Sequence, residues 1–165
     1  MKILGIDPSI RRTGWAMISV LDDIYSPIAS GVIETKDTFS LNDRVFHIYK
    51  EMMDICWWKS PDAVAMEGGF VGRNMATAMK LVSARTACML ACGDHDLSIT
   101  EYKPARWRSS LGDPQYDKEE VRTMVEVVLG KLSIRYDDES DAYGVAICHA
   151  GALKEQDIVS RSSSW

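Results

Sequence analysis

Three extended, apolar segments occupy the first third of the chain and restrict its fold more than any other feature. They cover residues 2–7 (KILGID), 13–20 (TGWAMISV) and 27–35 (PIASGVIET), and turn-forming residues such as Pro8 and Asp22 separate them. Short connections of this kind join antiparallel neighbours. The pattern therefore predicts an antiparallel β-meander at the amino-terminal end.

Helices and strands alternate through the rest of the chain. A helix is expected from Ser40 to about Trp58, with one apolar face and a capping serine. The later expected elements are a strand at 62–67, a helix at about 74–92, a strand at 98–102, and helices that begin at Pro104, at Asp117 and at about residue 139. This order predicts one α/β domain, residues 1–157, with a five-stranded mixed β-sheet flanked by helices. Residues 158–165 are expected to form a flexible tail.

Length and composition narrow the class of protein. With 165 residues, of which 46% are hydrophobic, the chain fits one globular domain with a sizeable core. No apolar run approaches the roughly 18 residues that span a membrane, so we expect a cytoplasmic protein without a membrane segment. The four cysteines lack the close pairing of a zinc site and are predicted to be reduced core residues: Cys56, Cys88, Cys92 and Cys148.

Charge by itself does not suggest a nucleic-acid partner. The net charge is -5 and the sequence pI is near 5.2, whereas phosphate contacts usually come from a basic surface. The charge is unevenly distributed, however. Residues 71–110 carry six basic and three acidic side chains, a net +3. A local basic surface therefore remains compatible with the sequence.

The sequence positions of four carboxylates would allow them to lie close together in the fold. Asp7 ends the first strand directly before a proline, and Glu67 ends a later strand directly before two glycines. If these strands are neighbours, both side chains project from the same edge of the sheet. Asp138 and Asp141 lie three residues apart at the start of the final helix and share one helix face. Placing that helix beside the strand ends would gather all four.

Such a cluster predicts bound divalent cations. Unpaired carboxylates repel one another and raise their own pKa values, and hard oxygen ligands favour Mg²⁺ or Mn²⁺. Two such ions about 4 Å apart promote in-line hydrolysis of a phosphodiester without a covalent nucleophile. Each acid also has an ordinary structural explanation: a turn before proline for Asp7, a strand end before two glycines for Glu67, and a helix N-terminus for Asp138 and Asp141.

An ordered set of segments resembles the RuvC family of Holliday-junction resolvases. The segments are LGIDPS at 4–9, SGVIET at 30–35, MEGGF at 66–70, RNMATAMKLVSAR at 73–85, EYKPARWR at 101–108 and DESDAYGVAICH at 138–149. A GIDP-like start also occurs in sugar kinases, but that fold needs a chain about twice as long. The ordered set, spanning about residues 2–150, is specific for resolvases.

The resemblance implies an RNase H-like fold and a homodimer that nicks opposed strands of a four-way DNA junction symmetrically, in recombination and repair. It places the catalytic and metal-binding acids on Asp7, Glu67, Asp138 and Asp141, with two Mg²⁺ ions per site and Mn²⁺ as a substitute. The helix at 74–92, rich in small residues, contributes to the dimer in this family. Packing inside the chain is the alternative use of those small residues.

The resemblance also implies DNA contacts beyond the acids. Phe70 matches an aromatic residue that inserts at the junction, although it could instead fold back onto the core. The basic candidates for phosphate contacts are Arg73, Lys80, Arg85, Arg106, Arg108 and Lys118. Trp107 could stack on bases or anchor an amphipathic helix, and no catalytic role is expected for His149.

Two other functions remain open at this level. An RNase H-like nuclease acting on RNA or other branched DNA would use the same acids. A non-cleaving junction-binding protein would lack one or more of them, and all four are present. The acidic net charge leaves open whether a helicase partner is needed.

Overall fold

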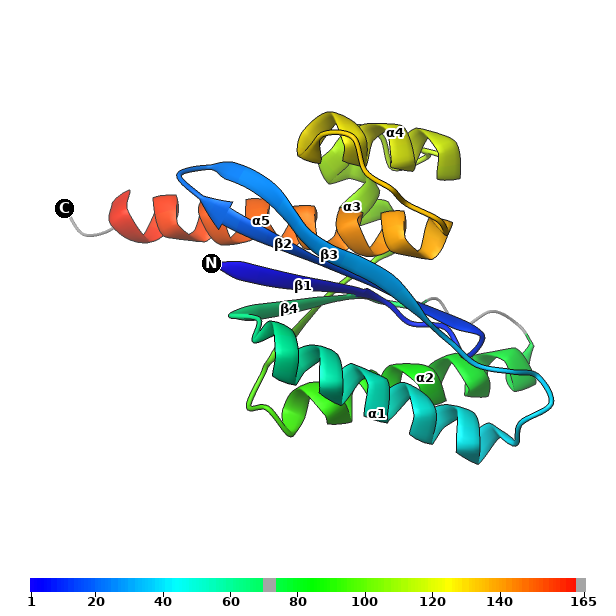
Figure 1. Cartoon of the computed structure of the whole chain (residues 1–165). Helices are drawn as coiled ribbons and strands as arrows, with labels where there is room; N and C mark the ends of the chain where they lie inside the picture. The colour runs from blue at the N-terminus through cyan, green and yellow to red at the C-terminus, as the bar shows by residue number, and fades with distance from the viewer. Residues whose placement is uncertain (70–73, 163–165) are drawn as a thin grey trace.

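The computed structural model describes residues 1–69 and 74–162 and is built on a five-stranded sheet of order β3-β2-β1-β4-β5 (Figure 1). β1 (Lys2–Asp7), β2 (Arg12–Leu21) and β3 (Ile24–Glu34) form the predicted antiparallel meander. β4 (Ala63–Glu67) and β5 (Ile99–Tyr102) extend the sheet, each parallel to its inner neighbour. The prediction of a five-stranded mixed sheet is confirmed.

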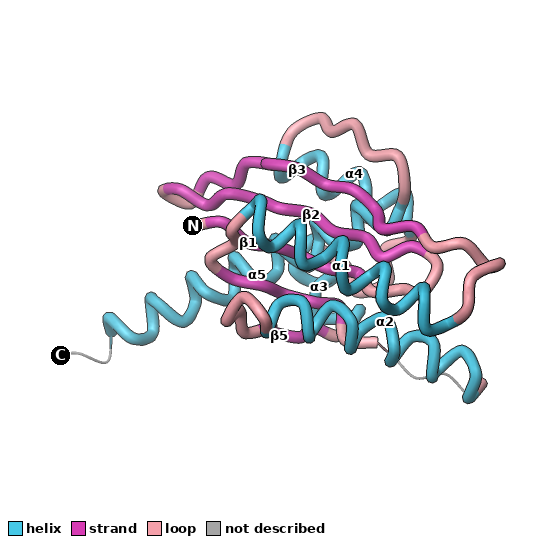
Figure 2. Tube along the Cα trace, turned by 60° about the horizontal axis from the view of Figure 1, so that its bottom comes forward, coloured by secondary structure: helices cyan, strands magenta, loops and turns pink. Residues whose placement is uncertain are grey.

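Helices cover both faces of the sheet (Figures 1 and 2). α1 (Leu41–Lys59) and α2 (Met75–Gly93) lie side by side on one face, and α3 (Pro104–Leu111), α4 (Lys118–Leu129) and α5 (Asp137–Ser162) lie on the other. Successive side chains of a strand face opposite sides, so Ile3 packs with α3–α5 and Leu4 packs with α1 and α2. Among the described helices, none is long and apolar enough to cross a membrane.

Helix ends follow the predicted capping signals at two positions. The Ser40 side chain accepts a hydrogen bond from the Asp43 backbone, and Asp117 and Glu120 form a reciprocal capping box. α5 differs from the prediction, because it continues to Ser162 instead of ending near residue 154. Residues 155–162 contain no glycine or proline to stop the helix. The segment 158–162, expected as part of a tail, is therefore helical.

The small residues of α2 pack inside the chain. The buried members are Ala78, Ala84, Ala87 and Ala91, and the last three belong to the core between α2, α1 and the sheet. They support close packing of two helices within one chain, which was the alternative to a dimer contact. The four cysteines are buried and form no disulfide, as predicted, and the Sγ atoms of Cys56 and Cys92 share a hydrogen bond at 3.9 Å.

Two glycines allow α5 to lie directly on the strands. A Cβ atom on Gly5 would lie 2.0 Å from the backbone oxygen of Ala142, and one on Gly14 would lie 2.0 Å from the backbone oxygen of Asp138. Gly14 is paired with Asp7 across β1 and β2. The first turn of α5 therefore packs against β2 at Gly14, directly across from the strand-end acid Asp7.

Candidate active site

The four predicted acids gather at one end of the sheet. Asp7 and Glu67 end β1 and β4, which are parallel neighbours, and Asp138 and Asp141 lie at the start of α5. Burial raises the pKa of Asp7 well above its usual range, and repulsion from Glu67, Asp141 and Asp138 raises it further. These carboxylates therefore lie within electrostatic reach of one another.

Three of the acids have a specific partner on one oxygen. The Trp107 indole Nε1 donates to Glu67 Oε2 at 2.8 Å. Lys118 Nζ lies 3.2 Å from Asp141 Oδ2. Arg12 Nε lies 3.3 Å from Asp138 Oδ2. Trp107 donates a hydrogen bond to its carboxylate, and Lys118 and Arg12 place a positive charge beside theirs. The two cations partly neutralise the negative charge of the cluster.

The residues fit a divalent cation in chemical type. Four carboxylates supply hard oxygen ligands, and Asp141 Oδ1 is buried without a hydrogen-bond partner among the described residues. Burial raises the pKa values of Glu67 and Asp141, while Trp107 and Lys118 respectively oppose that rise. No three acidic, histidine or cysteine side chains in residues 1–69 and 74–162 converge into a preformed metal site.

Trp107 is a core residue and not a base-stacking surface. Its side chain is 0% exposed, lies in the core with Leu111, and packs against Gly144 of α5. The guanidinium of Arg108 lies 4.6 Å from the centre of the ring. The stacking interpretation was wrong and the helix-anchor interpretation is confirmed. The four-residue spacing of Trp107 and Leu111 was the available sequence signal, because it places both on one face of a short helix.

The basic residues proposed for DNA contact occupy different environments. Arg85 Nη1 donates to the backbone oxygen of Glu67 at 2.6 Å and Nη2 lies 2.8 Å from Glu101 Oε2, so its guanidinium fixes the end of β4. Lys80 is exposed on α2, and Arg106 is 3.9 Å from Glu155. Arg108 and Lys118 lie close enough to the acids to lower the pKa of Glu67. Phe70 and Arg73 lie outside the described residues.

Two further residues near the site are Arg12 and His149. Arg12 was not selected from the sequence, because nothing in a single sequence pairs residue 12 with residue 138. His149 is buried and its Nδ1 is 2.9 Å from the hydroxyl of Tyr102. This contact joins β5 to α5, and the absence of a catalytic role for His149 stays a prediction.

The chain matches known proteins over most of its length. The family model described as "Crossover junction endodeoxyribonuclease RuvC" matches residues 3–149. The protein of that name from Caldicellulosiruptor saccharolyticus is 38% identical over 152 residues, covering 90% of this chain and 92% of the relative. The one from Allorhizobium ampelinum is 33% identical over 151 residues, covering 91% and 89%.

Solved structures agree with this match. T. thermophilus RuvC, solved in complex with a Holliday junction substrate, superposes with a TM-score of 0.85 at 27% identity, covering 94% of this chain and 96% of that one. The yeast mitochondrial Holliday junction resolvase Ydc2 gives 0.64 at 13% identity, covering 88% and 76%, which shows the fold alone. The expected RNase H-like fold is confirmed. The chain belongs to the RuvC family of crossover junction endodeoxyribonucleases.

Proposed function

We propose that this chain is a structure-selective endodeoxyribonuclease that resolves four-way (Holliday) DNA junctions by paired, symmetric nicks. The observation that carries the proposal is the gathering of Asp7, Glu67, Asp138 and Asp141 at one sheet edge in a member of this family. A cluster of carboxylates at the end of a sheet suits hydrolysis of a phosphodiester. The relative solved with a Holliday junction substrate supports the choice of substrate.

The four acids are proposed to hold two Mg²⁺ ions, which Mn²⁺ can replace. When bound, the ions would supply the Lewis acidity for in-line hydrolysis. Trp107 would keep the carboxylate of Glu67 in one orientation through its indole N–H. Lys118, which contacts Asp141, is placed to attract a phosphate to the acids.

The remaining DNA contacts are proposed on basic side chains, of which Lys80, Arg106 and Lys118 are exposed and Arg108 is half-buried. Lys80, Arg106 and Arg108 would contact phosphates together with Lys118, and the same role is proposed for Arg73. Phe70 is proposed to insert at the junction. Arg85 differs from these residues, because its guanidinium already binds the Glu67 backbone and Glu101. Its contribution to DNA binding is proposed to be indirect, through the position of β4.

One cleavage experiment tests the proposed preference for four-way junctions. Purified protein and Mg²⁺ are incubated with a four-way DNA junction, a plain DNA duplex and an RNA/DNA hybrid, and the cuts are mapped on denaturing gels. Symmetric nicks confined to the junction are the expected result. Cutting of the hybrid alone would establish the alternative nuclease function, and tight junction binding without any cut would establish a binding protein.

The exposed face of α2 supports a two-fold dimer. This face carries large apolar side chains: Met75, Met79, Val82, Met89 and Leu90. Their spacing places them along one side of the helix, and monomers rarely expose a stripe of this kind. An isologous contact through α2 would present two identical sites to a junction that is itself two-fold, which accounts for paired incision.

We expect Met79→Glu to break the dimer, because a charge would be buried without a partner at the centre of the contact. Met79 is 61% exposed in the single chain, so the substitution should not disturb its fold. The dimer dissociation constant, measured by sedimentation velocity, should rise about a hundredfold, and the two junction cuts should become uncoupled. Trp58→Glu, at a 78% exposed position on α1, is the matched control. A Met79→Glu protein that stays dimeric would show that another surface mediates assembly.

A further inference from the structure

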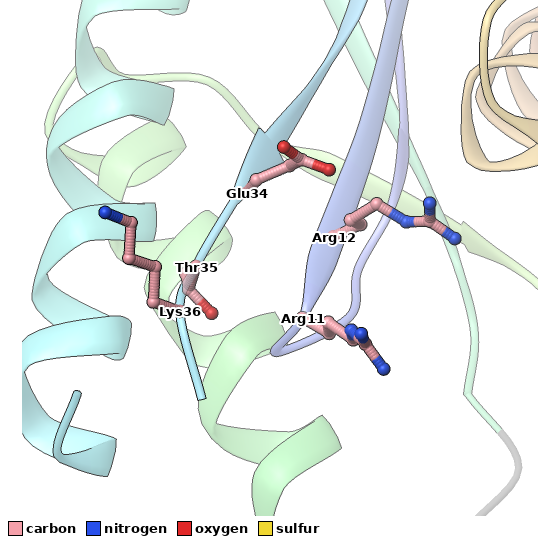
Figure 3. Close-up of a pocket in the computed structure, with 5 residues that line it drawn as sticks. All are labelled: Arg11, Arg12, Glu34, Thr35 and Lys36. Carbon is pink, nitrogen blue, oxygen red and sulfur yellow. The ribbon is translucent and has the colours of Figure 1, made fainter. Parts of the chain in front are cut away.

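A pocket of about 490 Å³ lies where β2 begins and β3 ends (Figure 3). Its lining residues are Arg11, Arg12, Glu34, Thr35 and Lys36. Figure 3 shows the side chains of Arg11 and Arg12 extending to the same side of β2, whereas the Lys36 side chain points the other way. The pocket therefore presents two adjacent guanidinium groups on one side of the sheet edge.

The turn that carries Arg11 is held in place by a buried cation. Arg44 of α1 is 6% exposed, and its guanidinium donates to Thr35 Oγ1 at 2.8 Å and to the backbone oxygen of Ile10 at 3.2 Å. The Thr35 backbone N–H in turn donates to the backbone oxygen of Arg11 at 3.0 Å. Asp37 Oδ1, 3.1 Å from Arg44 Nη2, compensates the buried charge, and the guanidinium thereby connects α1 to both sides of the turn. Arg11 is thus presented from a preorganised backbone.

The two arginines differ in how they are held. Arg12 contacts Asp138 at 3.3 Å, and its guanidinium carbon lies 4.8 Å from the centre of the Tyr136 ring. Arg11 is exposed and has no acidic partner among the described residues. The nearby Glu34 carries the only negative charge among the residues that line the pocket. A planar guanidinium matches the oxygens of a phosphate in geometry as well as charge.

The pocket adjoins the acidic cluster. Arg12 connects the two directly through Asp138, and Gly14, two residues further along β2, lies against the Asp138 backbone. The arginines therefore lie beside the place where a substrate phosphate would meet the four acids. We propose that Arg11 and Arg12 bind a phosphodiester of the substrate strand next to the one that is cut. This inference rests on the proposed nuclease function and adds a binding subsite to it.

Arg11→Ala tests the subsite. Binding of a fluorescein-labelled four-way junction is measured by anisotropy without divalent cations at several salt concentrations, and cleavage is measured separately at saturating protein with Mg²⁺. The dissociation constant should rise roughly tenfold, and the slope of log affinity against log salt should fall by about one, as expected for one lost phosphate contact. Lys50→Ala removes one positive charge from the outer side of α1 and is the control. It should change the dissociation constant by less than about twofold and leave the salt slope unchanged.

A neutral phosphate identifies the contact. Once the cuts are mapped, a methylphosphonate is placed at the phosphate on either side of the scissile one. At one of these two positions the methylphosphonate should weaken junction binding by the wild-type protein. The Arg11→Ala protein should bind the same modified junction as well as it binds the unmodified one. Unchanged affinity and salt slope in Arg11→Ala, or equal losses in both proteins with methylphosphonate, would overturn the subsite while wild-type cleavage still supported the nuclease function. Absence of wild-type cleavage would instead count against the proposed function itself.

Discussion

Asp7→Asn is expected to bind a four-way junction as well as the wild-type protein and to cleave it more slowly by several orders of magnitude. Burial raises the pKa of Asp7, and the negative charges of Glu67, Asp141 and Asp138 raise it further. An amide is a poorer ligand for a hard cation than a carboxylate, so the substitution should remove a metal ligand. The phosphate contacts come from other residues and should remain. Single-turnover cleavage in Mg²⁺ and anisotropy binding measure the two effects separately.

Asp137→Asn provides the matched control. Asp137 stands beside Asp138 in the first turn of α5, but it is exposed, and it is absent from the groups that raise the pKa of Asp7. The same change from carboxylate to amide should therefore alter the cleavage rate by less than about twofold. Near wild-type cleavage by Asp7→Asn would disprove the metal assignment. A large loss in Asp137→Asn would place that residue in the acid set.

The positions of the acids were predictable because each is tied to a local signal. Asp7 and Glu67 end apolar strands before residues that force the chain to turn, and Asp138 and Asp141 share a face at a helix start. The helix between the third and fourth strands also made a parallel pairing of β1 with β4 reasonable. Local sequence thus determined which carboxylates face the same edge of the sheet.

The partners of those acids could not be predicted in the same way. Trp107 and Glu67 are 40 residues apart, and Arg12 and Asp138 come from opposite ends of the chain. Such contacts depend on how α3 and α5 pack against the sheet, and a single sequence carries no local signal for that packing.

The interpretation of α2 needed helical periodicity as well as composition. Ala84, Ala87 and Ala91 recur at intervals of three and four residues, which is the spacing of one buried face. Met75 and Met79 lie on the exposed side of the same helix. Small residues were therefore a sign of close packing with α1, and the surface available to a second protomer is made of larger side chains.

Gly144→Ala is expected to destabilise the protein and to slow cleavage together. A Cβ atom at this position would lie 2.7 Å from Cζ3 and 2.8 Å from Cε3 of Trp107. The ring is fully buried and its N–H is engaged with Glu67, so it cannot move without breaking that bond. Overpacking of this kind lowers the free energy of unfolding by about 1–3 kcal/mol. Displacement of Glu67 should lower the single-turnover cleavage rate roughly tenfold to a hundredfold.

Gly151→Ala separates the contact from the general effect of placing alanine in a helix. Gly151 lies in the same helix, α5, and a Cβ atom there would meet nothing within 4 Å. Alanine should raise the free energy of unfolding by about 0.5–1 kcal/mol at this site and leave cleavage unchanged.

Trp107→Phe removes the N–H and keeps an aromatic ring, so the kcat of this variant should fall while its KM stays near the wild-type value. If Gly144→Ala is destabilised in urea yet cleaves at the wild-type rate, Trp107 supports the core without positioning Glu67.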